Sequence, residues 1–144
     1  MYLIDTNLIS EVRKKAKANP GVIEFFNHLA GTGKAVYLSA VTVGELRRGI
    51  ELIRLRGDAE QATLLEDWLT NLINEYADKV LAFDADAAQI WGRLRAPNPE
   101  HAIDKQIAAT ALVHDLTVVT RNTTDFEGTG VRVINPFVAA TTGQ

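Results

Sequence analysis

Short apolar runs alternate along the chain with longer stretches in which apolar residues recur at helical spacing. The runs predicted as strands lie before Asp5 and at 36–40, 80–83, 117–120 and 131–134. The stretches between them carry apolar residues at i, i+3 and i+4, which is typical of amphipathic helices. They predict helices at roughly 8–12, 20–31, 42–56, 59–77, 88–94 and 103–112.

Strands that alternate with helices usually pair in parallel, and the helices then cover both faces of the sheet. The pattern therefore predicts an α/β fold, a three-layer α/β/α sandwich with a central, mostly parallel five-stranded sheet. The length of 144 residues suits one domain. We expect that domain to span residues 1–137, and residues 138–144 to form a short C-terminal tail that frays.

Composition excludes several classes of protein. Hydrophobic residues make up 47% and charged residues 23%, and no segment is long and apolar enough to cross a membrane. The absence of cysteine excludes disulfides and thiolate metal sites, and with an N-terminus unlike a signal peptide it predicts a cytoplasmic protein. The net charge of -3 argues against a broadly basic surface for nucleic acid, but a nuclease with an acidic metal site remains compatible.

Asp5 directly follows the first apolar run, and Thr6 and Asn7 come next. All three residue types cap helices well, so the structural explanation is that one of them starts the next helix. In parallel α/β sheets, however, ligands bind beyond the carboxyl ends of the strands, which is where Asp5 is expected. This residue alone does not decide between a cap and a functional site.

Glu45 follows the second predicted strand, and the same choice arises there. Thr42-Val43-Gly44-Glu45 has the spacing of a capping box, in which Glu45 would bond back to the Thr42 amide. Asp84, after the third predicted strand, is interpreted as a helix cap only.

Asp104 is harder to explain as a structural residue. On a helical wheel it falls near the middle of the apolar arc to which Ile103, Ile107 and Ala111 belong. A carboxylate on the apolar side of a helix is costly, and proximity to the helix N-terminus offsets only about 0.3 to 1 kcal/mol. This position favours a functional role.

The fourth predicted strand is followed by Arg121-Asn122-Thr123-Thr124-Asp125. Because parallel strands end at one edge of the sheet, Asp5, Glu45 and this segment can meet there, and Asp104 can join them. Two carboxylates about 4 Å apart repel by about 4 kcal/mol at an effective dielectric of about 20, so the cluster needs a cation or raised pKa values. Carboxylate ligands favour Mg²⁺ or Mn²⁺, and metal-assisted hydrolysis of a phosphodiester is the chemistry that fits.

Four motifs occur in order along the chain. They are Leu3-Ile4-Asp5-Thr6-Asn7, Ser39-Ala40-Val41-Thr42-Val43-Gly44-Glu45-Leu46, Asp104 with Ile107-Ala108-Ala109-Thr110-Ala111, and Thr120-Arg121-Asn122-Thr123-Thr124-Asp125-Phe126. Together they resemble the PIN-domain family, and within it the VapC toxins of bacterial toxin–antitoxin pairs, particularly the FitB-like branch. The resemblance implies a Mg²⁺- or Mn²⁺-dependent endoribonuclease that forms a homodimer. It also implies a VapB-like or FitA-like antitoxin as inhibitor, and contact with operator DNA only through that antitoxin.

The resemblance assigns Asp5 and Asp104 as the principal metal ligands, and Glu45 as a third acid that binds metal or orients the attacking water. The fourth place is open, because many relatives carry an acid where this chain has Asn122, and the next acid is Asp125. Further supporting residues, which could equally cap helices or pair strands, are Thr6, Ser39 and Thr120.

Three other interpretations stay open at this point. A non-catalytic module that binds an antitoxin, and through it DNA, would need no metal. A phosphatase with Asp5 as its nucleophile would be expected to carry a second acid close behind, where the chain has Asn7. Metal-free acid–base cleavage would use histidine, but the spacing of His28, His101 and His114 does not indicate it, and they are interpreted as structural.

Overall fold

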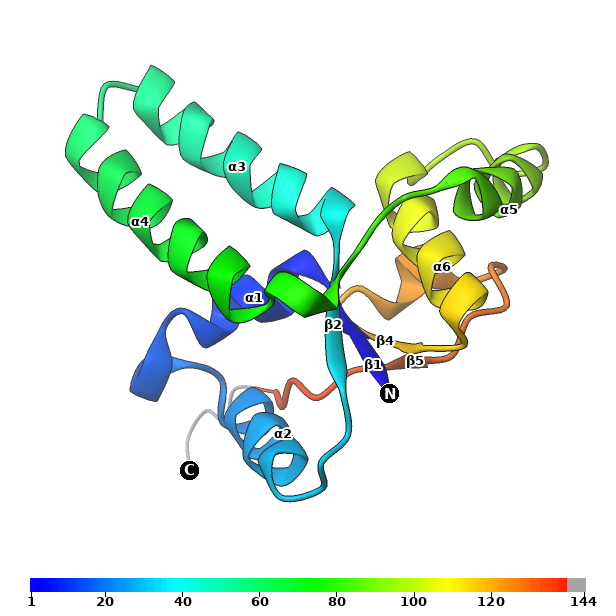
Figure 1. The fold of residues 1–144 in the computed structure, drawn as a ribbon, viewed down its shortest axis with the longest axis horizontal. Helices are drawn as coiled ribbons and strands as arrows, with labels where there is room; N and C mark the ends of the chain where they lie inside the picture. Colours follow the sequence, from blue (N-terminus) through cyan, green and yellow to red (C-terminus); the bar gives the residue numbers. More distant parts are fainter. Residues whose placement is uncertain (140–144) are drawn as a thin grey trace.

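The computed structural model describes residues 1–139, and Figure 1 shows how its helices and strands are arranged. The strands are β1 (Tyr2–Ile4), β2 (Val36–Ser39), β3 (Val80–Leu81), β4 (Thr117–Val119) and β5 (Val133–Ile134). The α-helices are α1 (Thr6–Val12), α2 (Pro20–Ala30), α3 (Ala40–Leu55), α4 (Ala59–Glu75), α5 (Ala85–Arg95) and α6 (Ala102–His114). The short 3₁₀ helices are η1 (Lys15–Lys17), η2 (Ala77–Lys79) and η3 (Thr123–Phe126).

The five strands form one parallel sheet in the order β3-β2-β1-β4-β5. The first strand of the chain lies in the middle, where Leu3 pairs with Tyr37 of β2 and with Val118 of β4. The chain builds outward from β1 through β2 and β3, then returns to the other side of β1 for β4 and β5. Ligands of parallel α/β sheets bind at such a switch point, just beyond the carboxyl ends of the strands.

Neighbouring residues of the central strands point to opposite faces of the sheet, and this divides the interior into two cores. Ile4 and Val119 belong to a core that is completed by residues of α1, α2, α3 and α4. Leu3 and Val118 belong to a second core, which α6 completes together with Leu94 of α5. Helices therefore cover both faces, and the predicted three-layer α/β/α sandwich is confirmed.

Several predicted bounds and orientations were wrong. Helix α3 begins at Ala40 and not near Thr42, because the Ser39 hydroxyl accepts a hydrogen bond from the Val41 amide and caps the helix. On α6, Ile103 was expected in the buried arc, but it is exposed, and Lys105 is buried instead. The reason is that α6 packs against α5 as well as against the sheet, so its buried side is not the single apolar arc of the wheel. Strands β3 and β5 are also shorter than predicted, since only two residues of each pair with a neighbour.

The segment after β5 packs on the start of α2. The Asn19 side chain caps α2 by accepting from the Gly21 amide, and it also exchanges two hydrogen bonds with the Val138 backbone. Residues 140–144 of the predicted tail lie outside the described residues. Within residues 1–139, none of the helices has the length and apolar character needed to cross a membrane.

We expect Gly21→Ala to lower the free energy of unfolding by about 1–3 kcal/mol, because overpacking of a close backbone contact costs that much. A Cβ atom at Gly21 would lie 2.1 Å from the Pro136 carbonyl oxygen. Gly49→Ala, within α3, is the matched control, since a Cβ there meets nothing within 4 Å. The control should raise stability by about 0.5–1 kcal/mol. Chemical denaturation of both variants measures the difference, and a neutral Gly21→Ala would contradict the packing described here.

Candidate metal-binding active site

Asp5 lies at the carboxyl end of β1, and three donors hold its carboxylate. Oδ1 accepts a hydrogen bond from the Thr6 amide at 2.8 Å, and Oδ2 accepts from Thr120 Oγ1 at 2.8 Å and from Asn7 Nδ2 at 3.2 Å. Only 3% of Asp5 is exposed. Asp5 therefore caps α1 and also stands at the functional edge of the sheet, so the two explanations of its sequence position do not compete.

Asn7 and Thr120 tie the end of β1 to the end of β4. Asn7 Nδ2 also donates to Thr120 Oγ1 at 3.1 Å, and Asn7 Oδ1 accepts from the Arg121 amide at 3.0 Å. Thr120 Oγ1 in turn accepts from the Asn122 amide at 3.0 Å. These bonds fix the position of Asp5 relative to the segment that carries Asp125.

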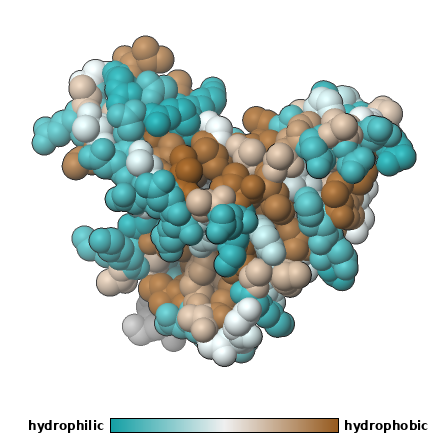
Figure 2. Space-filling model, viewed as in Figure 1, coloured by the Kyte–Doolittle hydropathy of each residue, from teal (hydrophilic) through white to brown (hydrophobic). Residues whose placement is uncertain are grey.

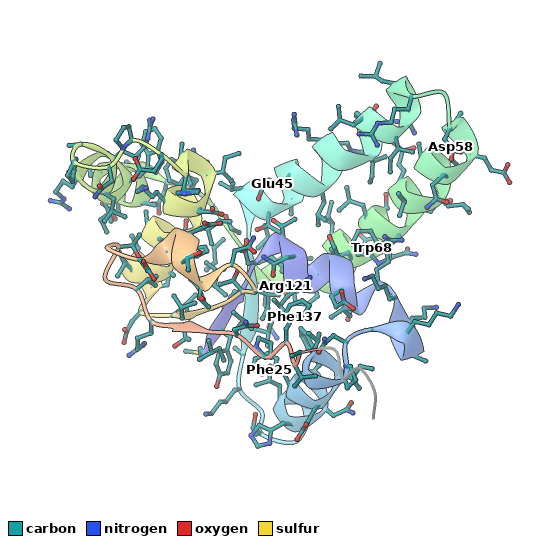
Figure 3. The ribbon with its side chains drawn as sticks, turned by 180° about the vertical axis from the view of Figure 1, so that it is seen from behind. Phe25, Glu45, Asp58, Trp68, Arg121 and Phe137 are labelled. Atoms are coloured by element: carbon teal, nitrogen blue, oxygen red, sulfur yellow. The ribbon has the colours of Figure 1, made fainter. Side chains whose placement is uncertain are left out.

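Glu45 joins this group from α3. Thr6 Oγ1 donates to Glu45 Oε1 at 2.8 Å, although the two residues are 39 positions apart in sequence. Figure 3 shows Glu45 near the start of α3. The alternative that Glu45 closes a capping box with Thr42 is thus wrong, because α3 already begins two residues before Thr42 and the Glu45 carboxylate is bound by Thr6.

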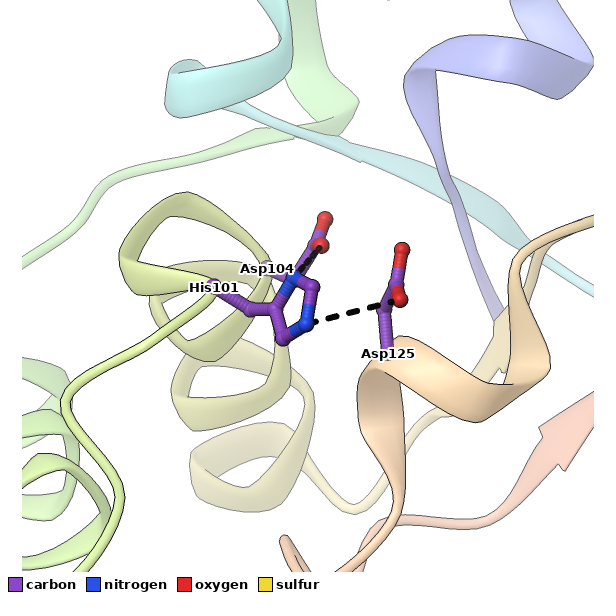
Figure 4. A group of neighbouring side chains, drawn as sticks. All are labelled: His101, Asp104 and Asp125. Atoms are coloured by element: carbon purple, nitrogen blue, oxygen red, sulfur yellow. Dashed lines mark ion pairs between the residues drawn. The ribbon is translucent and has the colours of Figure 1, made fainter.

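His101, Asp104 and Asp125 form the other half of the site (Figure 4). Asp104 lies in the first turn of α6 and Asp125 in η3, and the His101 ring lies between their carboxylates. His101 Nδ1 is 3.9 Å from Asp104 Oδ2, and His101 Nε2 is 3.7 Å from Asp125 Oδ1. Sequence reasoning missed His101, yet a signal was present: it stands three residues before Asp104, on the same side of a helix start.

The remaining predicted residues are Asn122 and Ser39, and neither joins the acid cluster through its side chain. Asn122 is exposed and precedes η3 without capping it through its side chain. Ser39 caps α3, as one of its two interpretations held. Of the two candidates for the fourth place, Asp125 is the one that joins the cluster with Asp104.

The acids lie close enough to influence one another's ionisation. Burial raises the pKa of Asp5 against the opposing hydrogen bonds from Thr120, Thr6 and Asn7, and it raises the pKa of Glu45 against the bond from Thr6. Burial, followed by the negative charges of Asp5, Asp125 and Glu45, raises the pKa of Asp104 to about 6, and His101 opposes that shift.

The donor set fits a divalent cation. Carboxylate oxygens are the ligands that Mg²⁺ and Mn²⁺ prefer, and a cation would relieve the repulsion that raises these pKa values. The one imidazole in the cluster adds a nitrogen donor, and the chain has no cysteine that would favour a softer thiolate site.

A family comparison agrees with this geometry. Residues 2–130 match the family model described as the PIN domain. The chain belongs to the PIN-domain family. The family identification made from the four sequence motifs is therefore confirmed.

Among curated relatives, toxin FitB of Neisseria gonorrhoeae is 38% identical, with 95% of this chain and 99% of the relative covered. A VapC ribonuclease of Sinorhizobium fredii is 34% identical, with 97% of this chain and all of the relative covered.

Solved PIN-domain structures share the fold over nearly the whole chain. The crystal structure of FitAcB from Neisseria gonorrhoeae has a TM-score of 0.80 at 37% identity, and it covers 94% of this chain and 98% of the matched chain. The structure of FitAB bound to a DNA fragment has a TM-score of 0.80 at 34% identity, with 98% and 99% covered.

The raised pKa of Asp104 predicts that the contribution of this residue to the stability of the metal-free PIN domain becomes less favourable as the pH rises. The pKa of Asp104 is about 6 in the folded state and ordinarily 3.8, so the penalty for its charge grows between about pH 4 and pH 6 and is constant above pH 6. We expect Asp104→Asn to be more stable than wild type at pH 7.5 in EDTA by about 1–3 kcal/mol, and the gap to close near pH 4. Asp67→Asn, on the exposed side of α4, is the matched control. Denaturant titrations at several pH values measure the gap, and a constant gap would refute the assignment.

Proposed function

We propose that this PIN domain is a Mg²⁺- or Mn²⁺-dependent endoribonuclease and the toxin of a type II toxin–antitoxin pair. The observation that carries the proposal is the gathering of Asp5, Glu45, Asp104 and Asp125 at the carboxyl edge of the sheet, where the acids of three segments raise the pKa of Asp104. Similarity to a protein named VapC ribonuclease supports RNA as the substrate, and similarity to toxin FitB supports the toxin role.

Each acid has a distinct place in the proposed site. Asp5 and Asp104 would be the principal metal ligands, and Asp125 would supply the fourth acid. Glu45 is held by Thr6, and its raised pKa makes it a stronger base, which suits a group that orients the attacking water and accepts its proton. A bound divalent ion would lower the pKa of its water and offset the charge that develops on the phosphate.

Asp5 is poorly suited to act as a covalent nucleophile, which argues against the phosphatase interpretation. Its Oδ1 is bound by the Thr6 amide, and its Oδ2 is bound by Thr120 and Asn7. Three hydrogen bonds lower the nucleophilicity of this carboxylate, and with 3% of Asp5 exposed a phosphorus atom has little room to approach it, whereas a small cation can use the remaining lone pair of Oδ1.

The shape of the surface supports an unpaired strand as the substrate. Figure 2 shows hydrophobic side chains gathered in the notch between the α3–α4 hairpin and the α5–α6 pair, and hydrophilic side chains on the outer surface of the hairpin. Single-stranded or loop RNA has splayed bases that can pack on such a surface and an exposed phosphodiester that can reach the acids. The predicted homodimer and the predicted cytoplasmic location stay predictions.

An apolar hollow between α1, α2 and α4 supports an antitoxin as partner. Its volume is about 370 Å³, and Val12 on its rim is 39% exposed. The structure of FitAB, to which this chain is similar, is bound to a DNA fragment. We infer that an apolar segment of a VapB-like or FitA-like antitoxin covers the hollow and links this chain to operator DNA. The hollow is lined by Ile9, Val12, Arg13, Phe26, Trp68 and Leu72, among others.

Cleavage of a single-stranded RNA tests the catalytic proposal. We expect cleavage in Mg²⁺ or Mn²⁺, none in EDTA, and a loss of about 100-fold or more in Asp5→Asn, Asp104→Asn and Glu45→Gln, because each removes a charge from the site. Asp67→Asn should cleave like wild type. Product formation is followed on denaturing gels. Equal cleavage by wild type and Asp5→Asn would sink the proposal and leave the non-catalytic binding module as the better account.

Inhibition by the antitoxin tests the partner proposal. The antitoxin would be the small DNA-binding protein encoded beside this chain, and wild type should bind it and lose RNA cleavage. Val12→Glu should need at least about 10-fold more antitoxin for half inhibition, because it places a charge in an apolar contact, a cost of about 1.4 kcal/mol or more. Leu55→Glu, at the exposed end of α3, is the control and should be inhibited like wild type. Identical inhibition of all three proteins would place the antitoxin elsewhere.

A further inference from the structure

His101 has a backbone conformation that a non-glycine residue rarely adopts. Its φ of 56° and ψ of 47° lie in the left-handed region, which costs of order 1 kcal/mol or more for such a residue. This conformation turns the chain into α6 and brings the imidazole to the carboxylates of Asp104 and Asp125 (Figure 4).

Buried and half-buried side chains hold the peptide groups on either side of His101. Lys105 is 5% exposed, and its Nζ donates to the Glu100 carbonyl. Trp91 Nε1 donates to the Ala102 carbonyl at 2.9 Å, and the Lys105 amide donates to the His101 carbonyl at 3.0 Å. The left-handed turn is therefore held in place from three sides, which pre-organises the ring.

The three side chains lie close enough to share an ion, to which the ring can give only one of its nitrogens, because Nδ1 faces Asp104 and Nε2 faces Asp125. At 3.9 and 3.7 Å, the two nitrogen–oxygen gaps are too long for hydrogen bonds. Atoms bound to one octahedral ion at about 2.1 Å lie about 3 to 4.2 Å apart. One atom from each of the three residues lies within 4.8 Å of the others, so small side-chain rotations bring all of them into that range.

The cluster is also open to solvent, as a metal site must be. It borders a cavity of about 370 Å³ that His101, Lys105 and Asp125 line together with Asn98, Thr124 and Glu127. The cavity lets water and ions reach His101 and Asp125 from solvent.

We propose that His101 is a metal ligand, and that with Asp104 and Asp125 it forms a mixed nitrogen–oxygen site that prefers a first-row transition ion such as Mn²⁺ to Mg²⁺. The proposal deepens the proposed function, on which it rests for the use of a divalent ion. Imidazole is a good ligand for transition ions, whereas Mg²⁺ takes oxygen almost exclusively. His101 thus sets which ion the site selects, and the acids set how strongly any cation is held.

Metal binding to the full chain, measured without RNA, tests this inference. Mn²⁺ and Mg²⁺ affinities are determined by calorimetry, and pulsed electron paramagnetic resonance of the Mn²⁺-loaded protein detects nitrogen bound to the ion. His101→Ala should lower Mn²⁺ affinity by about 10- to 100-fold. Mg²⁺ affinity should change by less than about 3-fold, because Mg²⁺ makes little use of the nitrogen. The nitrogen signal of wild type should disappear.

Two further variants keep the result interpretable. His101→Asn removes the imidazole but retains a residue that tolerates the left-handed conformation, so it should behave like His101→Ala even if alanine disturbs the turn. His114→Asn, at the other end of α6, should keep both affinities and the nitrogen signal.

Three outcomes would overturn the inference: no nitrogen signal in wild type, equal losses of Mn²⁺ and Mg²⁺ affinity in the His101 variants, or no binding of either ion. The first two leave the proposed ribonuclease standing if Asp5→Asn still abolishes cleavage. The third removes the metal-dependent proposal as well.

Discussion

Repulsion between carboxylates at the carboxyl edge of the sheet is the constraint on which the rest of the site depends. Asp104 shows it most clearly, since the charges of Asp5, Asp125 and Glu45 add to burial in raising its pKa to about 6. Such a cluster destabilises the folded chain at neutral pH unless protons or a cation offset it. The fold therefore needs strong compensation nearby, and a cation that binds only the folded state would supply it.

At Asp5, the compensation within the protein comes from neutral hydrogen-bond donors. Thr6, Asn7 and Thr120 give it three hydrogen bonds, and the same residues connect β1, α3 and the end of β4. None of them brings a positive charge, so the acids remain available for a cation. A positively charged partner would hold the acids more tightly but would also compete with the metal. The arrangement gives a rigid site at some cost in stability, which is common for functional sites.

Local patterns in the sequence predicted the parts of the structure that local interactions decide. The short apolar runs and the helical spacing of the stretches between them were enough for the fold class. Glu45 shows where this reasoning fails. Its spacing from Thr42 predicted a local capping box, but its carboxylate accepts a hydrogen bond from Thr6, 39 positions away. Non-local contacts also explain why Lys105 is buried and Ile103 is exposed, against the helical wheel. The apolar period of α6 carries no information about its contacts with α5.

The approach of Asp125 to His101 could not be predicted from local patterns, because it depends on two irregular segments. A left-handed residue before α6 and a short 3₁₀ helix after β4 bring His101 and Asp125 together. An acid at position 122 would directly follow the Thr-Arg pair, on the exposed residue that precedes η3. Asp125 lies one turn further along, within η3, and faces His101. The turn before α6 and the helix η3 are thus both needed to bring the imidazole within 3.7 Å of the Asp125 carboxylate, and a change in either segment would separate the two side chains.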